Sequence, residues 1–371
     1  MSDMPDMPDD VLGDAVERLE WDERKEEENP FKRWRQITRR TALTGGAAGI
    51  AAAILEACGG KSSTTTAAAS SSSAASIFGA SGSYKFTLVN HVTTNPFFAP
   101  TQTGASDASK LLGSSFQWTG SQTSNVSEMV NALNSAVSAK VNGIGVSLVD
   151  QTAFNSPVGA AISAGIPVVA YNADVPTNPR LAYIGQNLFL SGQELGKHIA
   201  QLVPSGDVAL FIATPGSLNI QPRINGAMDT LKSFPAIKTH VVATGAAVPT
   251  ELSTIQAYAK GHPSTKGMFA VDAGSTQGVA QTIQSQGLKG KVKGGGYDLL
   301  GPTVTLLNDG FIQVTIDQQP YLQGFFPILE LYLYNASKTL SGIADVNTGL
   351  KFITSANVKP YVDNPNSSYE K

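Results

Sequence analysis

Residues 84–98, YKFTLVNHVTTNPFF, decide the architecture of the chain. An apolar run from Tyr84 to Val89 predicts a buried strand, which leads straight into a polar turn and then a helix-like segment. In open α/β sheets, ligands bind in the crevice outside the carboxyl ends of the strands. We therefore expect the turn after this strand to face a ligand.

Three side chains of that turn suit a small polar ligand. Asn95 carries an amide that both donates and accepts hydrogen bonds, and Phe97 and Phe98 carry flat apolar rings. The C–H face of a sugar ring packs well on an aromatic ring. From the sequence alone, the two phenylalanines fit equally well as core residues that open a helix.

Length and composition bound the possible functions. The chain has 371 residues, of which 15% are charged, and this length fits an export segment followed by two domains. Beyond residue 57 the basic and acidic residues nearly cancel, so we expect no nucleic-acid partner. The single cysteine, Cys58, excludes an intrachain disulfide, and no His, Asp or Glu cluster has the spacing of metal ligands. We therefore expect neither a metal nor a cofactor.

The beginning of the chain carries an export pattern. A basic run over 32–40 leads into an Ala- and Gly-rich segment, 41–57, which is too short and too weakly apolar for a transmembrane helix of about 20 residues. The sequence Thr-Arg-Arg-Thr-Ala-Leu at 38–43 resembles a twin-arginine export signal. We therefore expect residues 1–57 to be an export signal, with an uncleaved signal anchor as the alternative.

The export segment ends in a lipidation pattern. Residues 55–58, Leu-Glu-Ala-Cys, resemble a lipobox, in which the cysteine is lipidated and becomes the new N-terminus. Glu56 departs from that pattern, which usually has a small neutral residue there. Residues 58–83 are nearly all Ser, Thr, Ala and Gly after the cysteine, as in a flexible tether. We expect Cys58 to anchor the protein to the outer face of the cytoplasmic membrane, or the protein to lie in the periplasm.

From Tyr84 onward, apolar runs alternate with segments of helical spacing, which indicates parallel sheets covered by helices on both faces. The rhythm restarts near Asn187, so two similar halves follow each other, and a long apolar helix is expected from Pro320 to Leu340. The expected strands lie at 84–89, 115–118, 143–148, 167–171, 181–184, 207–212, 238–243, 267–271, 292–296, 312–316 and 350–353.

These motifs in this order resemble the type I periplasmic sugar-binding proteins of the ribose-binding group, which are the extracellular receptors of ABC sugar importers. The resemblance covers roughly 84–358. It implies an α/β fold of two Rossmann-like lobes, each a parallel sheet flanked by helices, joined by a three-strand hinge. It also implies an N-terminal lobe of 84–186 plus 319–346 and a C-terminal lobe of 187–318 plus 347–365.

The resemblance assigns four ligand contacts to the N-terminal lobe: Asn95, Phe97, Phe98 and Asn172. Asn172 ends a strand at which the family usually has an aspartate followed by a polar residue, so the ligand need not be ribose. Asp174, two positions later, is a further candidate, and an ordinary turn residue is the alternative.

Three other residues near strand ends of this lobe are weaker candidates. His91 can hydrogen-bond a ligand, and Trp118 can form a wall of the pocket, although packing explains both as well. Ser147 falls where the family often has a polar contact, and a strand-end hydroxyl that bonds its own backbone is the alternative.

The C-terminal lobe supplies four charged or polar matches. Arg223 matches the family's ligand-contacting arginine, with a solvated helix residue as the alternative, and Asp298 matches its sugar-binding carboxylate. Asp272 stands where the family usually has asparagine, and Gln318 lies in a crossover that touches both ligand and hinge. A guanidinium facing two carboxylates gives a pocket suited to hydroxyl groups. The segment 244–249 lacks the family's second stacking aromatic, which opens the pocket.

We therefore expect an extracytoplasmic solute-binding lipoprotein of a carbohydrate ABC importer. It is expected to be a monomer that traps a monosaccharide or related polyol by hinge closure, presents the closed form to a membrane permease, and has no enzymatic activity. A sensing subunit for an autoinducer-2-like or nucleoside ligand stays open. A LacI-type regulator needs an N-terminal helix-turn-helix in place of the signal and tether. Asp272 and Asp298 can in principle do glycosidic acid–base chemistry, but no hydrolase motif is present.

Overall fold

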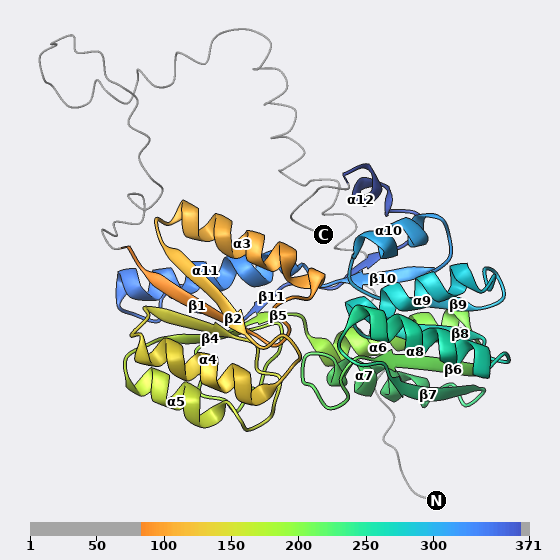
Figure 1. Cartoon of the computed structure of the whole chain (residues 1–371), viewed down its shortest axis with the longest axis horizontal. Coiled ribbons are helices and arrows are strands. Elements are labelled where there is room, and N and C mark those ends of the chain that lie inside the picture. Colours follow the sequence, from red (N-terminus) through yellow and green to blue (C-terminus); the bar gives the residue numbers. More distant parts are fainter. Residues whose placement is uncertain (1–82, 365–371) are drawn as a thin grey trace, which may run out of the picture. The chain divides into compact units, whose positions relative to one another are not determined.

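The computed structural model describes residues 83–364, all of which fall within the compact unit Ser71–Lys371. The predicted export signal, Cys58 and nearly all of the predicted tether lie outside the described residues. The described chain forms two six-stranded sheets with helices on both faces of each (Figure 1). We call each sheet with its helices a lobe.

The first lobe is built on a parallel sheet in the order β11-β5-β4-β3-β1-β2. Its strands are β1 (Lys85–Asn90), β2 (Ser115–Gly120), β3 (Gly143–Val146), β4 (Val168–Tyr171), β5 (Tyr183–Gly185) and β11 (Val346–Asn347). Its helices are η2 (Pro96–Phe98), α3 (Ala99–Leu111), α4 (Val126–Ser138), α5 (Asn155–Ser163) and α11 (Pro320–Ser337).

The second lobe repeats this strand order as β12-β10-β9-β8-β6-β7, with only β12 antiparallel to its neighbour. Its strands are β6 (Gly206–Ile212), β7 (Ile237–Ala243), β8 (Gly267–Ala270), β9 (Lys293–Tyr297), β10 (Val314–Asp317) and β12 (Lys351–Ile353). Its helices are α6 (Leu188–Leu202), α7 (Gln221–Leu231), α8 (Val248–Gly261), α9 (Ala273–Ser285), α10 (Gly301–Asn308) and α12 (Lys359–Asp363). Consequently β4 corresponds to β9, and β5 corresponds to β10.

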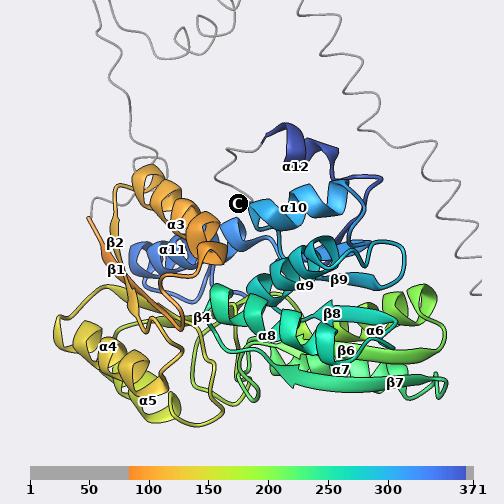
Figure 2. The same cartoon turned by 45° about the vertical axis from the view of Figure 1, so that its right-hand side comes forward.

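Each sheet is buried on both faces, which explains its continuous apolar runs. In β1, Leu88 packs with α3 and α11, whereas its neighbour Val89 packs with α4 and α5. In β6, Leu210 faces α6 and α7, and Phe211 faces α8 and α9. Figure 2 shows α8, α9 and α10 gathered on one side of the second sheet.

The chain passes between the sheets three times, after β5, β10 and β11. The second passage returns helix α11 to the first lobe, where it lies beside α3 although the two are far apart in sequence (Figure 1). Gly324 permits this packing, because a Cβ there would lie 1.8 Å from the carbonyl oxygen of Thr101. Helix α11 therefore belongs to the core of the first lobe.

The two-sheet α/β prediction is confirmed. Each of the eleven expected strands overlaps an observed one, and the expected helix from Pro320 corresponds to α11. The two-residue strand β11 was not expected, because so short a strand shows no period in the sequence.

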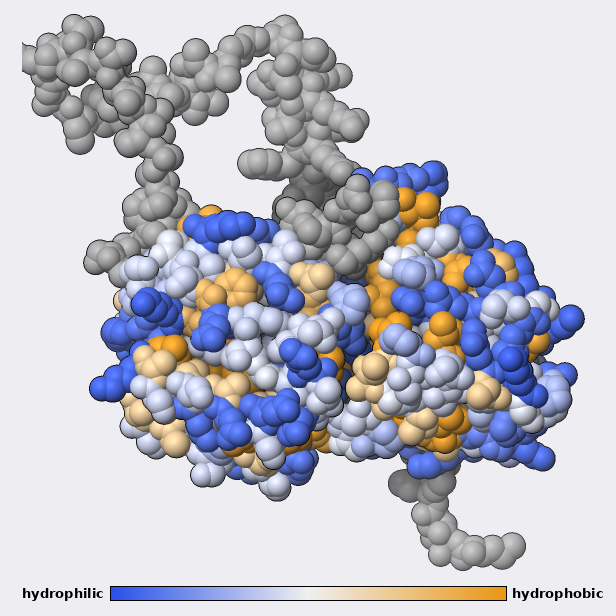
Figure 3. Space-filling view, viewed as in Figure 1, coloured by the Kyte–Doolittle hydropathy of each residue, from blue (hydrophilic) through white to orange (hydrophobic). Residues whose placement is uncertain are grey.

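The surface of the described residues carries scattered apolar side chains. The large exposed ones are Leu111, Phe189, Leu190, Phe234, Val241 and Leu340. Figure 3 shows hydrophobic residues in small groups among hydrophilic ones, as on an ordinary protein surface. Between residues 83 and 364, no helix has both the length and the apolar character that crossing a membrane requires.

Candidate functional site

Two equivalent strand ends form the centre of the candidate site. Asn172 follows β4 and Asp298 follows β9, and both have a positive φ, of 65° and 73°. Such a backbone conformation costs about 1–3 kcal/mol in a residue other than glycine, and it clusters at functional sites. Both side chains are buried. The fold therefore places one polar side chain of each lobe where an α/β sheet binds ligands.

Gln318 joins these two strand ends. Its Nε2 donates to Asp298 Oδ1 (2.9 Å), and its Oε1 accepts from Asn172 Nδ2 (3.5 Å). Gln323 of α11 holds Gln318 and Asn172 in place. Its Nε2 donates to Gln318 Oε1 (3.1 Å), and its Oε1 accepts from Asn172 Nδ2 (3.1 Å). A residue at a crossing between the sheets thus holds polar groups of both lobes.

Arg223 lies in α7 with only 1% of its surface exposed, so it is not the solvated helix residue that the sequence left open. Its Nη1 donates to the Val271 carbonyl (2.8 Å), and its Nη2 donates to Gln186 Oε1 (3.3 Å). The guanidinium carbon lies 4.0 Å from the centre of the Tyr297 ring. Gly192 of α6 lets α7 approach this closely, because a Cβ there would lie 2.2 Å from the Arg223 carbonyl oxygen.

Two buried polar atoms of this group have no hydrogen-bond partner among the described residues: Arg223 Nε and Asn172 Oδ1. Leaving a buried polar atom unpaired costs about 1–3 kcal/mol. One of these atoms is a donor from the second lobe, and the other is an acceptor from the first. A hydroxyl group both donates and accepts, so hydroxyl groups suit this pair.

Three carboxyl groups of the second lobe, those of Asp298, Glu251 and Asp272, are largely held away from water. Burial raises the pKa of Asp298 to about 7, although the positive charge of Arg223 opposes the shift. Burial, and next the negative charge of Asp272, raise the pKa of Glu251 in α8 to about 9. Burial also raises the pKa of Asp272. Each of these carboxyl groups would therefore be stabilised by a partner that accepts a hydrogen bond from its protonated form or that takes the place of the lost water.

Asp272 caps helix α9. Its Oδ1 accepts from the Ser275 backbone nitrogen and its Oδ2 from that of Ala213, both at 2.9 Å. A side-chain oxygen at this position satisfies a donor that the first turn of a helix would otherwise leave unpaired. The capping role explains why a carboxylate stands at the end of β8, and a ligand contact of Asp272 stays a prediction.

Aromatic rings form the facing surface of the first lobe. The centre of the Phe98 ring lies 4.7 Å from that of Phe97 and 5.9 Å from that of Trp118, and the Trp118 Nε1 donates to the Thr93 carbonyl (3.2 Å). This cluster also packs against Ala273 and Leu300 of the second lobe. Asn95 caps η2, since its Oδ1 accepts from the Phe97 backbone nitrogen (3.0 Å). The aromatic rings thus belong to a core that reaches the other lobe.

His91 and Ser147 lie in a second polar chain between the lobes. Ser147 Oγ is 3.1 Å from His91 Nδ1, and Asn219 Nδ2 of the second lobe is 3.0 Å from His91 Nε2. An amide nitrogen only donates, so His91 Nε2 accepts and Nδ1 carries the proton. Burial lowers the pKa of His91 to about 4, which keeps the ring neutral. Both side chains therefore already have protein partners.

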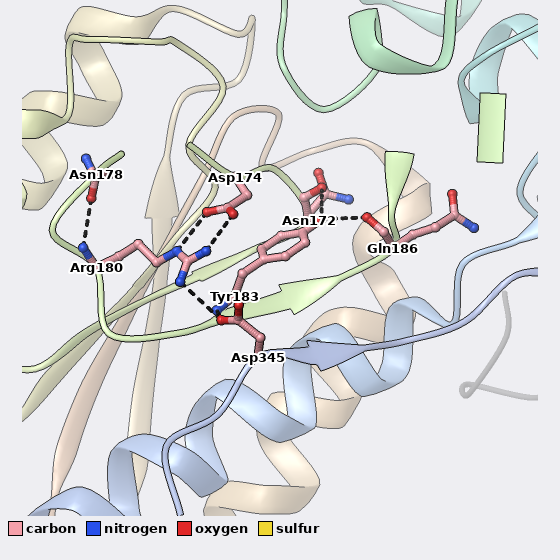
Figure 4. A network of polar contacts seen from close by, with 7 residues as sticks. All are labelled: Asn172, Asp174, Asn178, Arg180, Tyr183, Gln186 and Asp345. Carbon is pink, nitrogen blue, oxygen red and sulfur yellow. Dashed lines mark hydrogen bonds and ion pairs between the residues drawn. The ribbon is translucent and has the colours of Figure 1, made fainter. Parts of the chain in front are cut away.

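Asp174 belongs to the polar network drawn in Figure 4. Arg180 donates to both of its carboxylate oxygens, from Nε (2.9 Å) and Nη2 (2.7 Å), and from Nη1 to Asp345 (3.1 Å). The guanidinium thus ties the segment after β4 to the segment before β11. This geometry favours a structural role for Asp174, the turn alternative, over a ligand contact.

Two residues of this region were not predicted as parts of the site. Gln186 accepts from Arg223, and its Nε2 donates to the Gly349 carbonyl (3.0 Å). The Tyr183 hydroxyl lies 3.2 Å from the Asn172 carbonyl and 3.1 Å from the Gln186 carbonyl, as donor (Figure 4). A signal for Gln186 exists in the sequence, because a glutamine directly follows both equivalent strands, β5 and β10.

The residues brought together are donors, acceptors and aromatic rings. Within the described part of the chain, no three His, Cys, Asp or Glu side chains are grouped so that they could hold a metal ion. The residues that meet here can form hydrogen bonds to hydroxyl groups and can pack on a ring face.

Comparison with known proteins identifies the family. The family model of the periplasmic binding protein domain matches residues 86–337. The xylose/arabinose-binding protein XylF of Sulfolobus acidocaldarius is 51% identical over 296 residues, which cover 76% of this chain and 73% of that protein. A D-ribose/D-allose-binding protein of Pseudomonas aeruginosa is 22% identical over 256 residues, which cover 66% of this chain and 80% of that protein.

Solved structures agree with this assignment. The ABC transporter solute-binding protein of Burkholderia graminis in complex with D-arabinose has a TM-score of 0.70 and 27% identity, and the match covers 78% of this chain and 98% of that one. A glucose-galactose-binding protein of Geobacillus stearothermophilus shares the fold, with a TM-score of 0.68, 24% identity, and coverage of 74% and 99%. The chain therefore belongs to the periplasmic binding protein family, in its type I, sugar-binding group.

Proposed function

We propose that this protein is the carbohydrate-binding subunit of an ABC importer and that its ligand is an aldopentose of the xylose or arabinose type. The relative in Sulfolobus acidocaldarius is named for these two sugars, and the neighbour from Burkholderia graminis holds D-arabinose. Other monosaccharides and related polyols form the wider class of ligands, and the test described below includes them.

One observation carries the proposal: Gln318 bridges Asn172 and Asp298, which end equivalent strands of the two sheets. The unpaired Arg223 Nε and Asn172 Oδ1 belong to the same group of residues. A polyhydroxylated ligand between the lobes satisfies these atoms and replaces direct contacts between the polar groups. The aromatic rings of Phe97 and Phe98 then offer an apolar surface to its C–H face.

The mechanism we propose is hinge closure. The two lobes, 84–186 plus 319–346 and 187–318 plus 347–365, turn about the three crossings and close on the sugar. Each lobe supplies part of the contacts, so the ligand binds the closed form more tightly and shifts the population toward it. No bond is made or broken, and the closed form is what a membrane permease recognises.

The family works outside the cytoplasmic membrane. We propose that this chain reaches that place by a twin-arginine signal and stays there as a monomer through a lipid on Cys58. The sequence pattern at 38–43 and 55–58 supports this part of the proposal. Mass spectrometry of the membrane-bound protein tests it, since lipidation adds acyl mass at an N-terminal Cys58.

Thermal unfolding of the full chain with a panel of sugars tests the ligand. The panel contains D-xylose, L- and D-arabinose, D-ribose, D-glucose and xylitol, and calorimetry follows for each sugar that raises the midpoint. A ligand at a hundred times its Kd stabilises by about 2.7 kcal/mol. A shift with xylose or arabinose that disappears in Asp298→Ala supports the proposal. Unchanged midpoints with every member of the panel would contradict it.

A further inference from the structure

A hydroxyl group holds the left-handed strand end of each lobe. In the first lobe, the Tyr183 hydroxyl donates to the Asn172 carbonyl at 3.2 Å (Figure 4). In the second lobe, the Thr315 hydroxyl donates to the Asp298 carbonyl at 2.7 Å. Asn172 and Asp298 both have a positive φ, and they follow the equivalent strands β4 and β9. The same kind of contact is therefore made twice, once at each half of the candidate site.

The two hydroxyl groups come from equivalent positions. Tyr183 stands three residues before Gln186, and Thr315 stands three residues before Gln318. These glutamines directly follow the equivalent strands β5 and β10. The longer tyrosine has room because its strand continues with Gly185, where a Cβ would lie 2.2 Å from the Tyr183 hydroxyl oxygen. A tyrosine thus makes in the first lobe the contact that a threonine makes in the second.

The strand ends need such a contact because of their backbone. A positive φ is unfavourable in a residue other than glycine and persists only where the surrounding structure imposes it. The backbone nitrogen of Asn172 donates to the Ile184 carbonyl (3.1 Å), and that of Asp298 donates to the Ile316 carbonyl (2.9 Å). The hydroxyl groups bind the carbonyls of the same two residues. Each left-handed residue is therefore held at both its nitrogen and its carbonyl by the next strand of its sheet.

The held backbone decides where the polar side chains point, because the allowed rotamers depend on φ and ψ. The side chains of Asn172 and Asp298 both meet Gln318. Thr315 is fully buried and Tyr183 is half-buried. Burial raises the pKa of Tyr183, so its hydroxyl keeps the proton that it donates. Both hydroxyl groups therefore act on the two strand ends.

We propose that Tyr183 and Thr315 are positioning residues of the sugar site. Their hydroxyl groups hold Asn172 and Asp298 in the left-handed conformation that directs the two polar side chains toward the ligand. The inference rests on the proposed function, because the affinity that it explains is affinity for a sugar. It deepens that function by naming two residues that set the affinity without contacting the sugar.

Calorimetry with the pentose that binds most tightly tests the proposal on variants of the full chain. Thr315→Val removes the hydroxyl with little change of shape, and we expect the Kd to rise about tenfold. Thr315→Ser keeps the hydroxyl, and we expect a Kd within about twofold of the unchanged protein. Tyr183→Phe should raise the Kd less, about threefold, because its proton is shared between two longer contacts, to the carbonyls of Asn172 and Gln186.

Two matched controls repeat these changes away from the strand ends. Thr87 is buried in β1, and its hydroxyl has no hydrogen-bond partner among the described residues. Thr87→Val therefore makes the same change as Thr315→Val without breaking such a bond. Tyr334→Phe removes a hydroxyl from a half-buried position of α11. We expect each control to change the Kd by less than about twofold.

A double-mutant cycle separates positioning from a general loss of stability. If Thr315 acts through the side chain of Asp298, Thr315→Val should change the Kd of an Asp298→Ala protein by less than about twofold. A loss of affinity that arises from general destabilisation would instead add to that of Asp298→Ala. An additive result overturns the proposal.

Crystal structures of the sugar-free variants provide a measurement that needs no ligand. In Thr315→Val we expect the contact between Asp298 and Gln318, 2.9 Å in the unchanged protein, to be lost. If Thr315→Val does not fold, Tyr183→Phe and its effect on Asn172 decide instead.

The outcomes separate this inference from the proposed function. Unchanged affinity in both hydroxyl-free variants, or weakened affinity with both strand ends unmoved, overturns the positioning role and leaves the proposed function intact. Absence of binding by every sugar of the panel to the unchanged protein overturns the proposed function. The crystal structures then still decide whether the hydroxyl groups position the two strand ends.

Discussion

The two lobes share one scaffold but present different chemistry to each other. Their sheets have the same strand order, and a polar residue with positive φ follows the equivalent strands β4 and β9. The first lobe nevertheless offers aromatic rings and a neutral His91, whereas the second offers Arg223 and buried carboxyl groups. A sugar has apolar C–H faces and polar edges, so each lobe satisfies only one part of it. We therefore expect tight sugar binding to need contacts from both lobes.

The contrast is sharpest at Asn172 and Asp298. These residues hold equivalent positions and share Gln318, yet one is an amide and the other a carboxyl group. The carboxyl group is the one of the two that lies within the influence of the positive charge of Arg223. The scaffold is thus repeated, and the ionic part of the site is concentrated in one lobe.

Among these substitutions, removal of the Arg223 guanidinium should weaken sugar binding the most. Arg223→Ala is expected to weaken sugar binding by about 2–4 kcal/mol, because it breaks a buried charged contact. Calorimetry measures the loss, and the unfolding midpoint without sugar reports any damage to the α6–α7 packing. Lys232→Ala, an exposed change at the end of the same helix, is the control. Affinity equal to that of the unchanged protein would mean that the positive charge of Arg223 does not contribute to sugar binding.

Removal of the facing carboxyl group tests the same side of the comparison. Asp298→Ala is expected to cost about 2–4 kcal/mol in binding, and Asp298→Asn less, because the amide keeps an acceptor like that of Asn172. Asp309→Ala, at an exposed position after α10, serves as the matched control. Full affinity in Asp298→Ala would place the sugar elsewhere.

The carboxyl groups and His91 should differ in their dependence on pH. The raised pKa values of Asp298 (about 7) and Glu251 (about 9) in the second lobe, and of Glu330 (about 8) in α11 of the first lobe, mean that the folded state holds protons the unfolded state has lost. Their contribution to stability is complete below the unfolded pKa values near 4 and is lost as pH rises through the folded values. We therefore expect the free energy of unfolding to fall as pH rises through these windows.

His91 has the opposite sign, since its lowered pKa of about 4 makes stability fall as pH drops from about 6.5 through 4. Three groups outweigh one, so unfolding midpoints without sugar should decrease from pH 5 to pH 9. Glu251→Gln should flatten this decrease, because it removes one of the carboxyl groups whose pKa is raised. A midpoint that rises across this range would show that the buried carboxyl groups are charged in the folded protein.

The aromatic side of the comparison should give the smallest effect. Phe98→Leu keeps an apolar side chain in the cluster but removes the ring, so we expect sugar binding to weaken by about 1 kcal/mol. Phe234→Leu, at an exposed position of the second lobe, is the control. Sugar binding that is unaffected in Phe98→Leu would make the phenylalanines core residues only, which is the alternative that the sequence left open.

The sequence alone predicted the parts of this protein that depend on local pattern. Apolar runs of strand length and segments of helical spacing placed both sheets, because the inner strands, such as β1, are buried on two faces. Asn172, Asp298 and Gln318 were predicted as ligand contacts from the resemblance to the family, and each directly follows a strand of the structure.

Only the tertiary structure decided which of these residues meet and what else holds them. Asn172 pairs with Gln323 across 151 positions, and His91 meets Asn219 across 128. No local period records such contacts, because they depend on where α11 and α7 pack against the sheets. The same holds for Asp174, whose turn position was visible in the sequence but whose partner Arg180 also grips Asp345, 165 positions further along the chain. Pattern determines which surfaces are buried, and packing between distant segments determines which polar groups are brought together.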